Sequence, residues 1–160
     1  MEGDTLEVLK GVLRMPQDTV SLLRRYMDAC GGSDLAALDD ILSPDFVGHD
    51  PDMPPIRGRD EFKKMILACP FGEMQTEIAD VFGDESRGVI RWHVTGTHVG
   101  EVLGVPPTGK TITFDGVEVV HIDNGKITES WWYWDALGLA KQLGALPADF
   151  GRAPVEALAA

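Results

Sequence analysis

Four extended segments follow one another between Gln75 and Trp134, and this run constrains the fold more than any other feature of the chain. Each segment is rich in the β-branched and aromatic residues that favour strands. Asp84-Glu85-Ser86 and Asp123-Asn124-Gly125 are typical of tight hairpin turns, so we expect neighbouring segments to pair in antiparallel fashion. The predicted strands are 75–82, 88–98, 111–122 and 126–134.

Helical periodicity precedes and follows the strands. The spacing of Val20, Leu23, Tyr26, Met27 and Cys30 predicts a helix that stops at the glycine pair 31–32. Helices followed by a run of strands indicate an α+β domain, in which N-terminal helices pack on a strongly curved antiparallel sheet. The remaining predicted helices are a short one near 34–42, one from 60 to about 70, and a last one at 136–143.

Composition and charge limit the partners of the chain. A net charge of −12 argues against nucleic acid and anionic membranes, which both need a basic surface. At 160 residues we expect one domain at 16–147, an N-terminal extension at 1–15 and a flexible C-terminal tail at 148–160. Cys30 and Cys69 have no ligand-type spacing and are expected to be reduced, with the cytoplasm as the default location.

Apolar residues occur at both parities of the long strands, for example at Val89, Ile90, Trp92 and Val94. Both faces of the sheet are therefore expected to be covered, one by helices and the other by a second subunit of a homodimer. The spacing of histidines and carboxylates gives no metal signature, and no nucleotide motif is present. We expect no cofactor and no metal.

Motifs typical of one known family occur in segments 34–38, 44–51, 57–58, 96–101, 104–110 and 123–131 through Asp135. They resemble the SnoaL-like polyketide cyclase or ester cyclase family, within the nuclear transport factor 2-like superfamily. The resemblance implies a cystatin-like, cone-shaped α+β barrel. It also implies a cofactor-free bacterial enzyme of the lyase or isomerase class, which closes a ring in a polyketide intermediate of antibiotic biosynthesis by acid/base aldol-type chemistry.

Asp135 and His121 are the predicted catalytic residues. The resemblance places the acid/base aspartate at Asp135, where an aromatic strand ends, and His121 supports it from the preceding strand. A hydrogen bond between them would fix the imidazole tautomer and hold the carboxylate ionised. Alternatively, Asp135 caps the last helix and His121 is a core or interface residue.

Five further residues are predicted to bind a hydrophobic small-molecule substrate. Aromatic faces stack on flat ligands while hydroxyl groups orient carbonyls, although each aromatic residue could equally belong to the core. His49 is placed at a cavity mouth, where the alternative is a structural turn before Pro51. The predicted binding residues are Tyr26, His49, Trp92, Trp131 and Tyr133.

The activity itself stays open at this level, because one scaffold hosts many functions. Orientation of the substrate alone would allow a pericyclic, Diels–Alder-type ring closure without any acid/base residue. The same scaffold would also suit an isomerase of the ketosteroid type, an epoxide hydrolase or a non-catalytic small-molecule binding protein.

Overall fold

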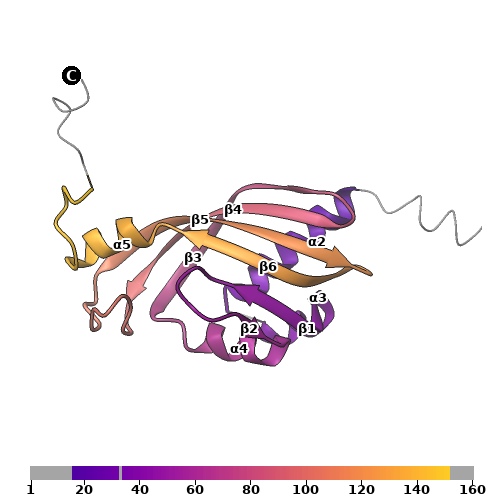
Figure 1. Cartoon of the computed structure of the whole chain (residues 1–160), viewed down its shortest axis with the longest axis horizontal. Helices are drawn as coiled ribbons and strands as arrows, with labels where there is room; N and C mark the ends of the chain where they lie inside the picture. Colours follow the sequence, from indigo (N-terminus) through magenta and orange to yellow (C-terminus); the bar gives the residue numbers. More distant parts are fainter. Residues whose placement is uncertain (1–15, 33, 152–160) are drawn as a thin grey trace, which may run out of the picture.

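Helices and strands follow one another in the order predicted for an α+β fold (Figure 1). The structure, a computed structural model, describes residues 16–32 and 34–151. The predicted extension at 1–15 and the tail from 152 onward lie outside the described residues. The elements are α2 Pro16–Cys30, η1 Leu35–Ala37, α3 Leu38–Ile41, β1 Leu42–His49, β2 Ile56–Arg57, α4 Arg59–Leu67, β3 Phe71–Gly83, β4 Arg87–His98, β5 Thr111–Asp123, β6 Lys126–Trp134 and α5 Ala136–Leu143.

The strands form a single six-stranded sheet in the order β2-β1-β6-β5-β4-β3. The antiparallel pairing of β3 with β4, β4 with β5 and β5 with β6 confirms the predicted hairpins. The sheet is nevertheless mixed, because β1 pairs with β6 in parallel, which corrects the expectation of a fully antiparallel sheet. The connection between them is long enough for a parallel pair, since it contains β2, α4 and the three strands β3, β4 and β5.

Alternation along the strands gives the sheet two different faces. The face that packs against α2 and α4 in the buried core is called the inner face, and the opposite one the outer face. The inner face carries Ile90, Trp92, Val94, Phe114, Glu118, Val120, Ser130, Trp132 and Trp134. The outer face carries Val89, Val117, Val119, His121, Glu129, Trp131 and Tyr133.

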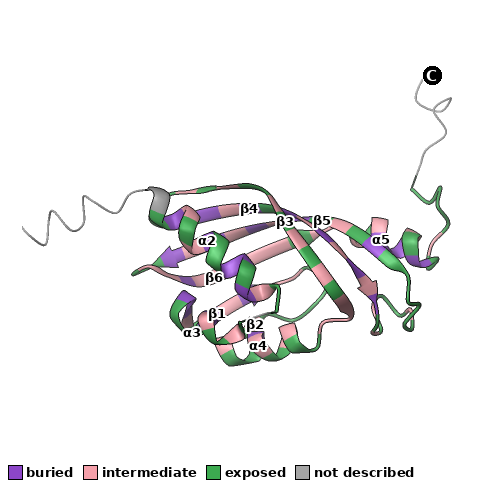
Figure 2. Ribbon diagram, turned by 180° about the vertical axis from the view of Figure 1, so that it is seen from behind, coloured by how far each residue is buried: buried purple, intermediate pink, exposed green. Residues whose placement is uncertain are grey.

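Two helices cover opposite ends of the inner face, as the opposite views in Figures 1 and 2 show. At one end α2 buries Leu23 and Tyr26 in the main core. At the other end Leu139 and Leu143 of α5 pack around Ile112. Between them, Phe114, Trp132 and Trp134 of the inner face are only partly buried.

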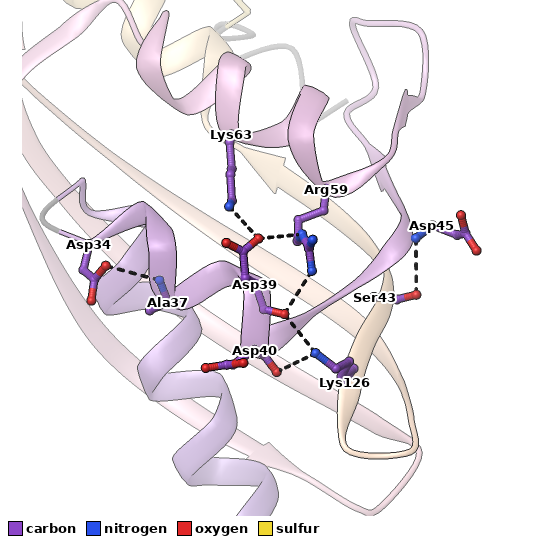
Figure 3. A network of polar contacts seen from close by, with 9 residues as sticks. All are labelled: Asp34, Ala37, Asp39, Asp40, Ser43, Asp45, Arg59, Lys63 and Lys126. Atoms are coloured by element: carbon purple, nitrogen blue, oxygen red, sulfur yellow. Dashed lines mark hydrogen bonds and ion pairs between the residues drawn. The ribbon is translucent and has the colours of Figure 1, made fainter.

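Charged side chains tie the short helix α3 to α4 and to the β5–β6 turn (Figure 3). The Asp39 carboxylate accepts a hydrogen bond from Lys63 Nζ at 2.6 Å and pairs with Arg59 Nε at 2.8 Å. Lys126 Nζ donates to the backbone carbonyls of Asp39 and Asp40 at 2.9 and 3.1 Å. Lys126 therefore satisfies two carbonyl groups near the end of α3 and links α3 to the start of β6.

Close approach of a side chain to Gly116 gives a test of the packing. A Cβ atom at this position would overlap the indole ring of Trp92 on the neighbouring strand. Gly116→Ala should therefore lower the free energy of unfolding by about 1–3 kcal/mol, measured by urea denaturation. Gly31→Ala is the matched control, because its Cβ would meet its nearest neighbour at an ordinary 3.4 Å. Equal losses in the two variants would contradict this packing.

Candidate active site

Glu118 is a carboxylic acid buried in an otherwise apolar part of the inner face. Its exposed fraction is 5%, and it lies opposite Ile90 of β4 and Trp132 of β6. The hydroxyl group of Tyr26, which α2 brings over the sheet, donates a 2.7 Å hydrogen bond to Glu118 Oε1. Within residues 16–32 and 34–151, no cation forms an ion pair with this carboxyl group.

Burial controls the ionisation of this group. Loss of water raises the pKa of Glu118 from its ordinary 4.5 to about 7, and the hydrogen bond from Tyr26 and the nearby hydroxyl of Ser130 only partly oppose the shift. Burial also raises the pKa of Tyr26 and of the Cys30 thiol well above their usual values, with the nearby Glu118 acting in the same direction. Glu118 is therefore the member of this group that exchanges a proton near neutral pH.

Two polar atoms near Glu118 have no well-formed hydrogen bond within the described part of the chain. They are the hydroxyl oxygen of Ser130 and the indole Nε1 of Trp92. Trp92 pairs with Gly116 and Ser130 with Val120, so both lie one inner-face position from Glu118 along the sheet. Buried polar groups usually have partners, and unpartnered donors around an acid are suited to a ligand carbonyl.

Half-buried aromatic rings continue the inner face from Glu118 towards α5. Trp134 lies 5.6 Å from Phe114, and Phe114 lies 5.3 Å from Phe71, between ring centroids. Trp132, directly opposite Glu118, lies 5.9 Å from Phe62 of α4. These rings form an apolar surface that a flat, largely hydrophobic molecule could stack on.

Two surface hollows among the described residues lie elsewhere. One of about 280 Å³ runs between α2 and the hairpin turns, with Thr19, Arg25 and Glu85 in its wall. Another of about 130 Å³ lies between α2 and β3. Neither includes Glu118 or the aromatic rings, and neither combines an acid of shifted pKa with unpartnered donors. We therefore place the candidate site by its chemistry, on the inner face.

Of the binding residues predicted from the sequence, Tyr26 and Trp92 lie on the inner face next to Glu118. The outer face holds His49, His121 and Trp131 around Glu129, with Tyr133 further along β6. His49 Nε2 lies 2.8 Å from Glu129 Oε1, and His121 Nδ1 lies 3.7 Å from Glu129 Oε2. The Trp131 ring stacks on His49 at 5.0 Å. The structure thus divides the predicted set between two faces.

Asp135 and His121 do not form the expected pair. Asp135 is exposed and caps α5, because its carboxylate accepts a 2.8 Å hydrogen bond from the backbone N–H of Gly138. His121 instead lies opposite Glu129, six residues before Asp135, which separates the two by roughly 20 Å along the strand. The hydrogen bond between Asp135 and His121 is therefore absent.

Glu118 and Ser130 are the site residues that the sequence alone did not reveal. The available signal was a lone glutamate in the strand GVEVVHI, at the same parity as the apolar Val120 and Ile122. His121 has the opposite parity, shared with Val117 and Val119. Since apolar residues occur at both parities, alternation alone did not show which face the helices cover.

The described residues offer no cluster of histidine, cysteine or carboxylate groups arranged for a metal ion. Both Cys30 and Cys69 are free and half-buried. Among the helices that the structure describes, none has the length and apolar character needed to cross a membrane. The inner face itself presents the carboxyl group of Glu118, the phenol of Tyr26, the hydroxyl group of Ser130 and the indole N–H of Trp92.

Comparison with known proteins shows which protein family this chain matches. A family model described as SnoaL-like polyketide cyclase matches residues 20–143. The chain is 27% identical over 133 residues to the aklanonic acid methyl ester cyclase DauD of Streptomyces sp. (strain C5), covering 78% of this chain and 81% of that protein. It is 26% identical over 137 residues to the aklanonic acid methyl ester cyclase DnrD of Streptomyces peucetius, covering 78% of this chain and 90% of that protein.

A solved structure shows the same fold. TsrD from Streptomyces laurentii superposes with a TM-score of 0.73 at 25% sequence identity, covering 82% of this chain and 98% of that chain. The superposition extends over most of both proteins, so the arrangement of helices on the curved sheet is shared.

The buried acid predicts an unusual dependence of stability on pH. Below its ordinary pKa of 4.5, Glu118 is protonated in both the folded and the unfolded chain. As the pH rises towards about 7, the unfolded chain releases this proton first, so the folded state loses stability. Glu118→Gln removes this loss, and should raise the free energy of unfolding by roughly 3 kcal/mol at about pH 8 while changing it little at about pH 4.

Chemical denaturation of both proteins at the two pH values measures this difference. Glu77→Gln is the control, because Glu77 is an exposed glutamate on β3. A Glu118→Gln variant that is no more stable than the parent at the higher pH would show that burial does not raise the pKa of Glu118.

Proposed function

This chain belongs to the SnoaL-like polyketide cyclase family, a family of enzymes, and we propose that it closes a ring in a polyketide-derived intermediate without a cofactor. The observation that carries the proposal is Glu118, a buried acid with a pKa of about 7 on a face lined with aromatic rings. The matched relatives are named as cyclases of aklanonic acid methyl ester. We take that ester as the first substrate to test.

Proton transfer at Glu118 would begin the reaction. The ionised carboxylate removes a proton from the carbon next to a substrate carbonyl, and the electron pair of the C–H bond forms an enolate. The enolate carbon then attacks a second carbonyl carbon of the same molecule and forms the new C–C bond. The oxygen of that carbonyl takes the proton back from Glu118, which balances the reaction and restores the carboxylate.

The neighbouring groups would stabilise charge during these steps. Tyr26 stays protonated because burial raises its pKa, so its hydroxyl donates a hydrogen bond throughout. Trp92 Nε1, which has no partner among the described residues, is a further donor on the residue opposite Gly116, and Ser130 opposite Val120 supplies a hydroxyl group. Donors fixed in a low-dielectric surrounding stabilise an enolate oxygen without reorganisation.

The aromatic surface supports a second contribution, the folding of the substrate. Rings such as Trp132, Trp134 and Phe114 would hold a flat intermediate so that its reacting carbons meet. If this contribution dominates, ring closure needs no proton transfer by the protein. The effect of removing the acidic proton from Glu118 separates the two mechanisms.

Glu118→Gln should lower kcat/KM for aklanonic acid methyl ester by roughly a hundred- to ten-thousand-fold, because the amide accepts a hydrogen bond but no proton. In the parent protein kcat/KM should rise with pH to a plateau above about 7, since the free enzyme must hold Glu118 ionised. Product formation followed by chromatography over a pH series measures both effects.

Asp135→Asn and His121→Ala belong in the same assay, because the roles predicted for Asp135 and His121 from the sequence stay predictions. Asparagine keeps the helix cap, so this variant removes only the titrating group. A severe loss in Asp135→Asn with normal turnover in Glu118→Gln would move the proton transfer to Asp135. Normal turnover in both variants would leave substrate folding as the mechanism.

The outer face supports the proposal of a homodimer. Val89, Val117, Val119 and Trp131 are apolar or aromatic, half-buried and turned away from the helices. A second copy would cover them, as the apolar residues at both parities predict. The cytoplasmic location predicted from the sequence stays a prediction.

Light scattering coupled to size exclusion tests the dimer. The parent chain should elute as a dimer at micromolar concentration, and Trp131→Glu should elute largely as a monomer because it places a charge in the interface. Leu67→Glu is the control, since Leu67 is 75% exposed on α4 and should leave the dimer intact. A parent chain that is monomeric would remove the proposal.

A further inference from the structure

The carboxylate of Asp50 joins two tryptophans of the inner face. Asp50 follows the last residue of β1, and its Oδ2 accepts hydrogen bonds from Trp132 Nε1 at 2.8 Å and Trp134 Nε1 at 3.0 Å. Its Oδ1 accepts a third bond from the backbone N–H of Asp52 at 2.8 Å. One half-buried acid therefore fixes the direction of two indole rings that lie at successive inner-face positions of β6.

These contacts differ from an ordinary surface ion pair. Among the described residues, Asp50 has no ion pair with a lysine, arginine or histidine, so neutral N–H groups alone hold its charge. Hydrogen bonds to an ionised acceptor are stronger than those between neutral groups. The arrangement thus restrains the two rings more than apolar packing would.

The ring of Trp132 is confined from a second side. A Cβ atom at Gly48 would lie 2.6 Å from Cη2 of Trp132, so the ring occupies the space that a side chain on β1 would fill. Gly48 and Asp50 together set the position of Trp132, and Trp132 lies directly opposite Glu118. The orientation of the Trp132 ring, which lies over Gly48, therefore depends on the end of β1.

We propose that Asp50 is a positioning residue, which holds Trp132 and Trp134 as one aromatic wall against which a flat, neutral substrate lies beside Glu118. The inference rests on the proposed function for the identity of the reacting acid. It adds that the substrate is oriented through the indole rings, and that Asp50 acts through them without touching the reacting atoms. Loss of the hydrogen bonds from Trp132 and Trp134 to Asp50 should weaken substrate binding more than it slows the proton transfer.

Asp50→Asn is the direct test, because it conserves size while its single amide oxygen cannot accept all three hydrogen bonds. Its dissociation constant for aklanonic acid methyl ester, measured by tryptophan fluorescence quenching, should rise by about tenfold. KM should rise similarly, kcat should change by less than about threefold, and the pH midpoint of kcat/KM should stay in place. The indole N–H resonances of Trp132 and Trp134 should shift in the ligand-free variant.

Two controls make the result specific. Asp52→Asn makes the same charge change two residues away, at an exposed side chain, and should leave binding unchanged. In a Trp132→Phe, Trp134→Phe background, Asp50→Asn should have no further effect on binding, because the rings through which it acts are gone. Thermal melts of all variants show whether each remains folded.

The outcomes separate this inference from the proposed function. If Asp50→Asn weakens binding of the ester but the parent protein forms no cyclised product, the aromatic wall is retained and cyclase activity on this ester is rejected. If Asp50→Asn changes neither turnover nor binding of the ester, the aromatic wall is rejected and the cyclase activity is retained. A parent chain that does not bind the ester, or an equal effect of Asp50→Asn without the two tryptophans, would also overturn the inference.

Discussion

The burial of one carboxyl group beneath α2 is the constraint on which the rest of the structure depends. Glu118 occupies a position where an apolar residue would stabilise the core, and its only well-formed hydrogen bond among the described residues comes from Tyr26. The ends of the inner face are closed by α2 and α5, so water is removed from the acid while the aromatic rings between them stay half-buried. Burial of the Glu118 carboxyl group lowers the stability of the folded protein, and the same burial lets this acid exchange a proton near neutral pH.

The same sheet serves two different purposes on its two faces. The inner face combines the acid with donors that have no partner among the described residues, and with two tryptophans that donate hydrogen bonds to Asp50. The outer face gathers His49, His121 and Trp131 around Glu129, where partly exposed titratable groups mix with apolar ones. A period of two along each strand separates these surfaces, so residues adjacent in the sequence belong to different environments.

Much of the fold could be predicted from the sequence because its signals are local. The turn at Asn124-Gly125, where both residues have positive φ, fixed the β5–β6 hairpin, and the predicted bounds of β6 and α5 are those observed. The parallel pairing of β1 with β6 could not be predicted, since it joins segments about 80 residues apart and leaves no periodic signal. Strand β2 is too short to be recognised.

The candidate site was harder to predict because it depends on which face the helices cover. Trp131 and Trp132 are equally aromatic, and only the packing of α2 and α4 shows that Trp132 lies inside. The sequence predicts Asp135 as the catalytic acid because it ends an aromatic strand. In the structure this residue caps α5. In the structure Glu129, Trp131 and Tyr133 lie on one face of β6 and Ser130, Trp132 and Trp134 on the other, as the period of two along a strand requires.

The ionisation of Glu118 can be measured directly by NMR titration of the protein labelled with ¹³C at glutamate side-chain carboxyl groups. The resonance of Glu118 is identified by its absence in Glu118→Gln. We predict a midpoint of about 7, well above the ordinary 4.5 of an exposed glutamate. A midpoint near 4.5 would show a solvated carboxylate that is ionised at all working pH values, and would contradict the assignment of Glu118 as the proton-transfer group.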